Sequence, residues 1–67
     1  MLFAHQQRVV DEKTALDIKI RSLESFIGEN PFFKTMDEPE ALLLIEQLEF
    51  MVGYSATLAK RIELFNK

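Results

Sequence analysis

Apolar side chains in the first half of the chain follow a helical repeat. The repeat runs through Val9, Leu16, Ile20, Leu23 and Ile27, and the polar residues Gln6 and Lys13 occupy two positions of the same stripe. Alternating steps of three and four residues are typical of a helix face that packs against another helix. The pattern therefore predicts a helix over residues 3–27.

The second half of the chain carries more apolar residues than one helix face can hold. One stripe consists of Ala41, Leu44, Leu48, Met51, Ser55, Leu58, Ile62 and Phe65, and it predicts a helix over residues 37–65. A second set, Leu43, Phe50, Tyr54 and Leu64, lies off that stripe. One stripe suits the first helix, so we expect the second set to contact another chain.

The residues between the two stripes predict a loop over residues 28–36. Gly28 follows the last periodic residue, where a left-handed helix stop forms most easily. The pair Asn30-Pro31 reinforces the break, because the residue before a proline is disfavoured in helical geometry. Phe32 and Phe33 are expected to fold back and close the open end of the helix pair, and binding of a partner is their alternative role.

The start of the second helix carries a capping signal. Asp37 is placed to cap the helix, Glu40 can reach back to its backbone N–H, and Pro39 falls in the first turn. Thr35 with Glu38 offers the same capping box two residues earlier. The second helix is therefore predicted to start at residue 37 or two residues earlier.

Two long helices joined by a short loop predict an all-α fold, an antiparallel two-helix hairpin formed by residues 1–67 as a single domain. A chain of 67 residues with no cysteine is close to the lower size limit for a single core, and disulfides cannot stabilise it. We therefore expect the hairpin to assemble into a homo-oligomer, a helical bundle that is not a monomer.

Pairing the two stripes brings polar residues together. Ile20 is expected to meet Leu48, and Lys13 is expected to lie opposite Ser55 with Tyr54 beside it. In one interpretation the Lys13 stem packs while its ammonium reaches water or a carboxylate of Glu12 or a neighbouring chain, and the layer fixes register. In the other, Lys13, Tyr54 and Ser55 form a polar pocket for an anion.

The charges of the chain limit the classes of partner that it is expected to bind. The net charge is −3, which argues against general binding to nucleic acid. The antiparallel fold nevertheless gathers basic residues where the chain termini meet (His5, Arg8, Lys13, Lys60, Arg61 and Lys67) and acidic residues at the loop (Glu24, Glu29, Asp37, Glu38 and Glu40). The longest apolar run, 41–45, is far shorter than the about 20 residues of a membrane span. No signal peptide is apparent, so we expect a cytoplasmic protein without membrane contact.

Catalysis has little support in the sequence. A lone His5 near the chain start, without cysteine, cannot assemble a catalytic triad or a zinc site. The acidic residues do not have the spacing of a di-iron bundle. We therefore expect no enzymatic activity, no metal site and no cofactor.

Several polar positions carry a resemblance. It runs through HQQRVVDEK (5–13), Leu16-Asp17, Lys19-Ile20, Leu23, Phe26-Ile27, Gln47-Leu48, Met51, Tyr54-Ser55, Leu58 and Arg61-Ile62. This pattern resembles a family of small, uncharacterised accessory proteins of tailed phages and prophages that are related to proteins of crAss-like phages. The resemblance implies a phage origin and an accessory role, and it assigns no functional residues.

Together these observations lead to one functional hypothesis with two forms. The chain is expected to be an oligomeric binding protein of phage origin that interferes with a host process such as antiviral defence. In one form, Arg8, Lys13, Tyr54, Ser55 and Arg61 bind a small anionic ligand such as a nucleotide, since arginine pairs with phosphate and tyrosine stacks on a base. In the other, an apolar surface docks on a host protein. A structural or regulatory coiled-coil module is the alternative, and Leu43, Phe50 and Leu64 form the expected oligomer interface.

Overall fold

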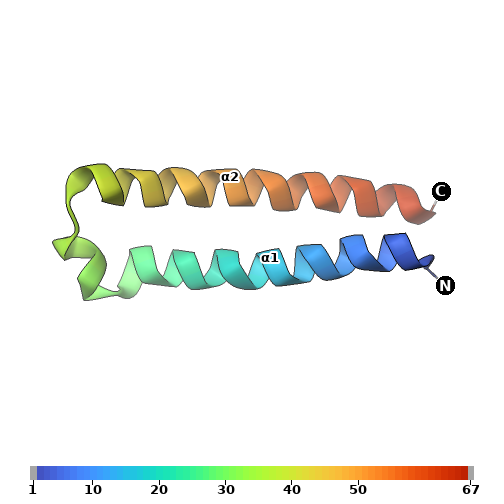
Figure 1. Ribbon diagram of the computed structural model, residues 1–67, viewed down its shortest axis with the longest axis horizontal. Coiled ribbons are helices and arrows are strands. Elements are labelled where there is room, and N and C mark those ends of the chain that lie inside the picture. The colour runs from blue at the N-terminus through green and yellow to red at the C-terminus, as the bar shows by residue number, and fades with distance from the viewer. Residues whose placement is uncertain (1, 67) are drawn as a thin grey trace.

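The computed structural model describes residues 2–66, the side chain of Asn66 excepted, as two long helices lying side by side (Figure 1). Helix α1 spans Ala4–Glu29 and helix α2 spans Glu38–Glu63, and a short 3₁₀ turn, Leu64–Asn66, continues α2. The start of α1 and the end of α2 lie at one end of the rod, and the connection lies at the other. The hairpin is 47 Å long and about 15 Å across. The predicted antiparallel hairpin is thus confirmed.

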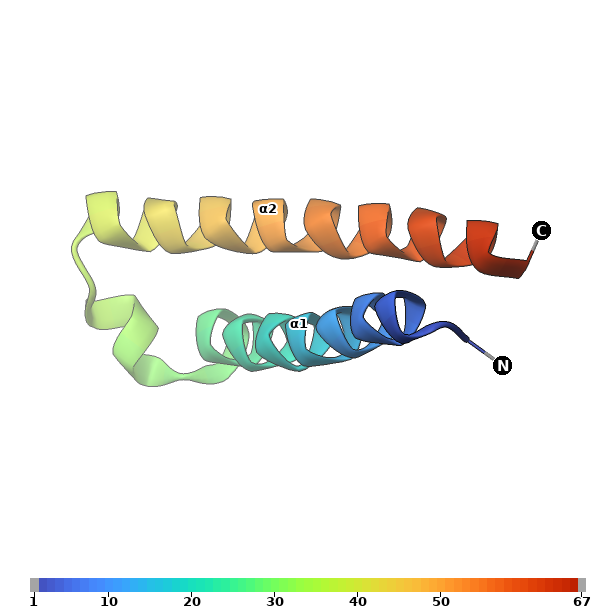
Figure 2. The same cartoon turned by 45° about the vertical axis from the view of Figure 1, so that its right-hand side comes forward.

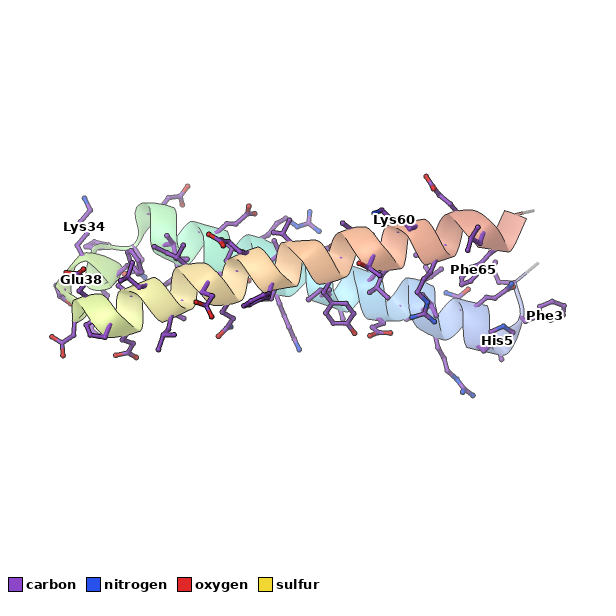
Figure 3. All side chains as sticks on the ribbon, turned by 90° about the horizontal axis from the view of Figure 1, so that it is seen from above. Phe3, His5, Lys34, Glu38, Lys60 and Phe65 are labelled. Carbon is purple, nitrogen blue, oxygen red and sulfur yellow. The ribbon has the colours of Figure 1, made fainter. Side chains whose placement is uncertain are left out.

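The helices incline against each other instead of running strictly parallel. Figures 2 and 3 show the inclination from two further directions. In Figure 3, His5 and Phe65 lie at the terminal end, while Lys34 and Glu38 lie at the loop end. This arrangement places the start of α1 beside the end of α2, as an antiparallel pair requires.

The two predicted stripes form the seam between the helices. Val9, Leu16, Ile20 and Leu58 are the buried apolar residues, and Leu58 is only 1% exposed. The other seam positions are half-buried: Gln6, Lys13, Leu23 and Ile27 in α1, and Ala41, Leu44, Leu48, Met51, Ile62 and Phe65 in α2. The core is thin because two helices can bury only one stripe each.

Asn30 and Pro31, and not Gly28, end the first helix. The expected left-handed stop at Gly28 is wrong: no described glycine has a positive φ, and α1 continues to Glu29. Asn30 then adopts an extended conformation before the proline. Its side-chain oxygen accepts a hydrogen bond from the Phe32 N–H at 2.8 Å, which starts a 3₁₀ helix over Pro31–Thr35.

The expected capping boxes at the start of α2 are not formed. Asp37 occupies the cap position, but its side chain makes no capping hydrogen bond. Thr35 instead ends the 3₁₀ helix Pro31–Thr35, where its hydroxyl donates to the Phe32 carbonyl at 2.7 Å, and Asp37 occupies the cap position of α2. Pro39 does lie in the first turn of α2, where its fixed φ suits the helix.

The two loop phenylalanines behave differently. Phe33 is half-buried and meets the ring of Phe26 edge-on, with 6.0 Å between centroids. Phe32 also approaches Phe26, at 6.5 Å, but it remains 66% exposed. Phe33 therefore closes the end of the hairpin as expected, whereas Phe32 leaves most of its ring in solvent.

Candidate functional site

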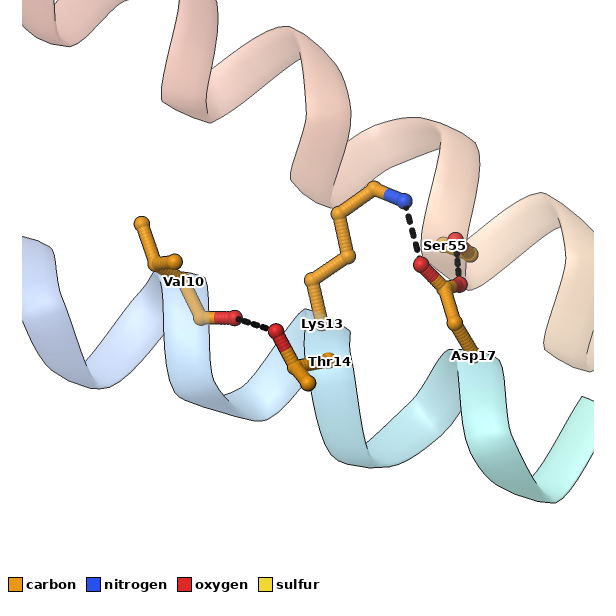
Figure 4. A network of polar contacts seen from close by, with 5 residues as sticks. All are labelled: Val10, Lys13, Thr14, Asp17 and Ser55. Atoms are coloured by element: carbon orange, nitrogen blue, oxygen red, sulfur yellow. Dashed lines mark hydrogen bonds and ion pairs between the residues drawn. The ribbon is translucent and has the colours of Figure 1, made fainter.

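A polar network interrupts the apolar seam at its middle. Asp17 of α1 binds two partners at once: Lys13 donates to one carboxylate oxygen at 2.7 Å, and Ser55 of α2 donates to the other at 2.6 Å (Figure 4). Ser55 is buried, whereas Lys13 and Asp17 keep 26% and 34% of their side chains exposed. The network therefore lies between the seam and the solvent.

The buried hydroxyl of Ser55 explains why a polar network forms within the seam. A hydroxyl buried in an apolar seam destabilises the fold unless it is hydrogen-bonded. Asp17 supplies the acceptor, and Lys13 compensates the charge of the carboxylate. The hydrogen bond from Lys13, followed by that from Ser55, holds the pKa of Asp17 below its ordinary value of 3.8. Asp17 is therefore an ionised carboxylate that links the two helices.

This network corrects the predicted register. Lys13 was expected opposite Ser55, but the residue that binds Ser55 is Asp17, one helical turn further along α1. In agreement, Leu23 lines a groove together with Met51, whereas the expected pairing of Ile20 with Leu48 would place Met51 near Leu16. The shift gives the buried hydroxyl a carboxylate partner, which the expected alignment does not provide.

The structure thus joins Lys13 and Ser55 through a residue that sequence reasoning missed. The spacing of Lys13 and Asp17, four positions apart, could have revealed their ion pair. The ammonium and the hydroxyl are both engaged by Asp17. The Asp17 carboxylate would repel an anionic ligand at this point. We therefore interpret Lys13, Asp17 and Ser55 as a clamp that links the two helices.

Tyr54 lies in a separate, open groove. It lines this groove with Leu43, Glu46, Gln47, Phe50 and Met51, all from α2. Tyr54 is 46% exposed, in contrast to its buried neighbour Ser55. Because successive helical residues are about 100° apart around the axis, Tyr54 points away from the clamp.

A second groove continues this surface onto α1. Its lining comprises Ile18, Lys19, Ser22, Leu23 and Phe26 of α1, together with Gln47 and Met51 of α2. Gln47 and Met51 belong to both grooves. The two grooves therefore form one mainly apolar surface on one side of the hairpin, which we call the open side.

Arg8 and Arg61 are both exposed and extend the open side toward the termini. Arg61 follows Tyr54 by seven residues, two helical turns along the same face of α2. Arg8 belongs to the α1 stripe Arg8, Glu12, Ala15, Lys19, Ser22 and Phe26, whose last three members line the groove. Among the described residues, neither guanidinium makes an ion pair. The two arginines and Tyr54 are thus available to a ligand.

A third depression lies at the loop end. Ser22, Ser25, Phe26, Glu29, Asn30 and Pro31 line it. Glu29 is the acceptor for the Ser25 hydroxyl at 3.1 Å, so the lining already carries a negative charge. This site is unsuited to an anion, and within residues 2–66 no group of three or more metal-ligating side chains is found.

The expected oligomer interface is exposed. Leu43, Phe50 and Leu64 keep 63%, 71% and 64% of their surface in solvent. Leu42 and Val52 add a further exposed stripe on another face of α2.

By length and composition α2 could also cross a membrane, but Glu46 and Glu49 lie within its apolar stretch, where charges are costly.

Comparison with known proteins places the chain in a family. The family model described as Sequestin matches residues 4–64, which include both helices and the loop. No curated protein and no solved structure matches the chain. The matched region contains the clamp residues Lys13, Asp17 and Ser55 as well as Tyr54 and the two arginines of the open side.

Proposed function

The chain belongs to the Sequestin family, and from this premise we propose that it is a non-catalytic, homo-oligomeric protein that sequesters a small anionic ligand such as a nucleotide. The family name is compatible with sequestering a ligand or partner and suggests binding instead of catalysis. The observation that carries the choice of ligand is the open side, where an exposed tyrosine lies on the same surface as two arginines that make no ion pair with another described residue.

The chemistry of these three residues suits a nucleotide. Each guanidinium offers a planar fork of donors that can bind two phosphate oxygens at once. The face of Tyr54 can stack on a base, and its hydroxyl can donate to a ring nitrogen or carbonyl. The apolar side chains of Leu43 and Phe50, which line the same groove, offer the base further contact surface.

The clamp has a supporting role in this proposal. Lys13 and Ser55 were candidate ligand-binding residues, and both are bound to Asp17. We assign them to holding α1 and α2 in register, which fixes Arg8 of one helix relative to Tyr54 and Arg61 of the other. A ligand that spans the two helices needs this register to meet both arginines.

Phage origin and interference with a host process also belong to the proposal. The resemblance to phage accessory proteins supports the origin, and sequestration of a signal is one way in which a non-catalytic protein can oppose antiviral defence. Such a protein acts in the cytoplasm of the bacterial host, where nucleotide signals are made.

Calorimetric titration with a panel of mono- and dinucleotides and inorganic phosphate tests the ligand. We expect saturable binding of at least one nucleotide, and substantially weaker binding in Arg8→Ala and Tyr54→Leu. Lys60→Ala is the matched control, because Lys60 is an exposed cation next to Arg61. Equal binding by Arg8→Ala and Lys60→Ala would remove Arg8 from the site. If no member of the panel binds, the proposal that the ligand is a nucleotide is wrong.

A second candidate, docking on a host protein, is favoured by one observation. Phe32 is 66% exposed on a loop whose other phenylalanine is packed. Exposed aromatic rings are frequent anchors of protein interfaces. This candidate predicts that Phe32→Ser abolishes capture of a specific host protein without affecting nucleotide binding. A purely structural self-assembly module predicts that neither a nucleotide nor a host protein binds.

A further inference from the structure

One continuous stripe of exposed side chains runs along α2 on the open side. It reads Glu40, Leu43, Gln47, Phe50, Tyr54, Thr57, Arg61 and Leu64, in alternating steps of three and four, and every member is exposed. Phe50 in its middle is 71% exposed, the largest value among the exposed large apolar residues of the described chain. Such a stripe has the pattern of a helix seam that lacks its partner.

The charges at the two ends of the stripe are opposite and nearly symmetric about Phe50. Glu40 precedes Phe50 by ten residues and Arg61 follows it by eleven. Two copies of the stripe laid antiparallel, with Phe50 at the centre, therefore pair Glu40 with Arg61, Leu43 with Thr57, and Gln47 with Tyr54. Laid parallel, they would place Glu40 against Glu40 and Arg61 against Arg61, which is unfavourable.

We propose that this stripe is the docking surface for a second copy of the chain, which binds antiparallel so that two hairpins form a four-helix bundle. The inference rests on the proposed function insofar as it gives the homo-oligomer named there a surface and an orientation. Because Tyr54 and Arg61 belong to this stripe, the nucleotide of the proposed function then binds between the two subunits, at the margin of the stripe that faces Arg8. The arrangement is isologous: the same stripe serves both subunits, as in most two-fold dimers.

The charge distribution of the whole hairpin favours the same orientation. Residues 18–50, which include the loop, carry seven acidic and three basic side chains, whereas the remaining residues carry four acidic and five basic ones. Antiparallel docking places the acidic loop end of one copy beside the terminal end of the other. Parallel docking would bring the two acidic ends together.

The packing at the seam shows which side of the hairpin is uncovered. On one flank, Val10, Asp17 and Ala59 are half-buried. On the open side, Lys19, Ser22 and Tyr54 are exposed, and an apolar groove separates the helices there. This groove offers Phe50 of a second copy an apolar surface formed by Ile18, Phe26 and Met51.

The other exposed apolar stripe of α2 lacks this complementarity. It contains Leu42, Ile45 and Val52, but Glu49 lies among them and Glu63 continues it. Antiparallel self-docking there would place Glu49 close to its own copy near the centre. The stripe through Phe50 is therefore the better surface for a second copy.

Engineered cysteines test both the surface and the orientation, because the chain has no cysteine of its own. Leu43→Cys and Thr57→Cys are made as separate full-length variants and oxidised alone or as an equimolar mixture. We expect the mixture to give disulfide dimers several-fold more efficiently than either variant alone. Val52→Cys, on the other stripe, is the matched control and is expected to remain uncrosslinked.

Charge exchange gives a second measurement that leaves the apolar residues intact. Glu40→Arg and Arg61→Glu, each alone, are expected to raise the dimer dissociation constant in sedimentation equilibrium, and the double variant is expected to restore it. Strong crosslinking of either single-cysteine variant alone would overturn the antiparallel orientation. Crosslinking of Val52→Cys would contradict the proposal that the stripe through Phe50 is the docking surface. So would a protein that does not dimerise and instead floats together with anionic phospholipid vesicles.

The outcomes separate this inference from the ligand proposal. Arg8 lies on α1 and outside the stripe, so Arg8→Ala is expected to remain dimeric while losing nucleotide binding. If the protein is a dimer but binds no nucleotide, the proposed docking surface stands and the proposed ligand is wrong. A monomer that binds nucleotide through Arg8 and Tyr54 overturns the docking surface and leaves the ligand intact.

Discussion

Ser55 of α2 donates its hydroxyl to Asp17 of α1 at 2.6 Å, across the seam and 38 residues away along the chain. This bond fixes which turn of α1 lies beside which turn of α2. Lys13 completes the arrangement by binding the other carboxylate oxygen of Asp17. Apolar contacts alone would allow one helix to slip by a turn along the other. The Ser55 hydroxyl, in contrast, is satisfied only where Asp17 lies opposite it.

The clamp predicts a pH-dependent contribution to stability. The pKa of Asp17 is lowered in the folded state, chiefly by the hydrogen bond from Lys13 and then by that from Ser55. A lowered folded-state pKa stabilises the fold above the ordinary carboxyl pKa of 3.8, and this contribution is lost as the pH falls below that value. We expect Asp17→Asn to melt at a lower temperature than the parent chain at pH 7. The difference should shrink when melting is followed by circular dichroism below pH 3.8, and a difference that grows with acid would contradict the assignment.

Replacing Ser55 tests the clamp from the other helix. Ser55→Ala removes the donor to Asp17 but leaves Lys13 in place. We expect the variant to unfold at a lower temperature than the parent, with a smaller loss than truncation of the core causes. Thr14→Ala is the control, since the exposed Thr14 donates its hydroxyl to the Val10 carbonyl within its own helix and lies outside the proposed docking stripe. Equal losses in the two variants would mean that the cross-helix bond adds nothing specific.

Truncation of the most buried side chain should be severe. Leu58 is 1% exposed, and Leu→Ala changes at such sites cost about 2–5 kcal/mol of the free energy of unfolding. That is a large share of the stability of a small domain. We expect Leu58→Ala to unfold at much lower urea concentration, whereas Leu42→Ala, at a residue 55% exposed, should change little. A small effect at Leu58 would contradict the seam described above.

Self-association should depend on the middle of the open-side stripe. A charge at the centre of a two-fold interface meets its own copy and is desolvated, so Phe50→Asp should give a monomer in sedimentation velocity. Val52→Asp places the same charge at another exposed apolar site and should leave the oligomer intact. A parent chain that is monomeric at micromolar concentration would contradict self-association altogether.

Membrane binding is expected to be absent, although α2 has the length and apolar content of a spanning helix. Glu46 and Glu49 interrupt the apolar stretch, and Ser55 is already engaged by α1. Fractionation of expressing cells should therefore leave the protein in the supernatant. Retention in the membrane pellet after a high-salt wash would contradict this, since such a wash removes proteins that are held by charge alone.

The periodicity of apolar residues was sufficient to predict the hairpin. The seam positions of both helices are those that the stripes indicate, and Leu43, Phe50, Tyr54 and Leu64 are exposed, as a second apolar set without a partner should be. Periodicity specifies a face but not a register, because a slip by one turn leaves the same face inward. The missing information lay in Asp17, a polar residue whose partner is distant in sequence.

Local signals were less reliable than periodicity. Gly28 permits a left-handed stop but does not require one, and the restriction that Pro31 imposes on Asn30 determined the helix end. Asp37 has the residue type of a cap without making the capping hydrogen bond. The candidate site was partly predicted: Tyr54 and Arg61 share a face by their spacing, whereas the separation of Tyr54 from the Lys13–Ser55 layer follows from the tertiary pairing.

The most direct test of sequestration is whether a bound nucleotide is removed from solution and later recovered unchanged. A nucleotide selected by titration is mixed with excess protein, free ligand is filtered off, and the retained protein is then heat-denatured. Our account predicts that mass spectrometry finds the nucleotide depleted from the filtrate and fully recovered, chemically intact, after denaturation, while Arg8→Ala leaves it in the filtrate. Recovery of a cleaved or modified product, or no depletion by the parent protein, would contradict it.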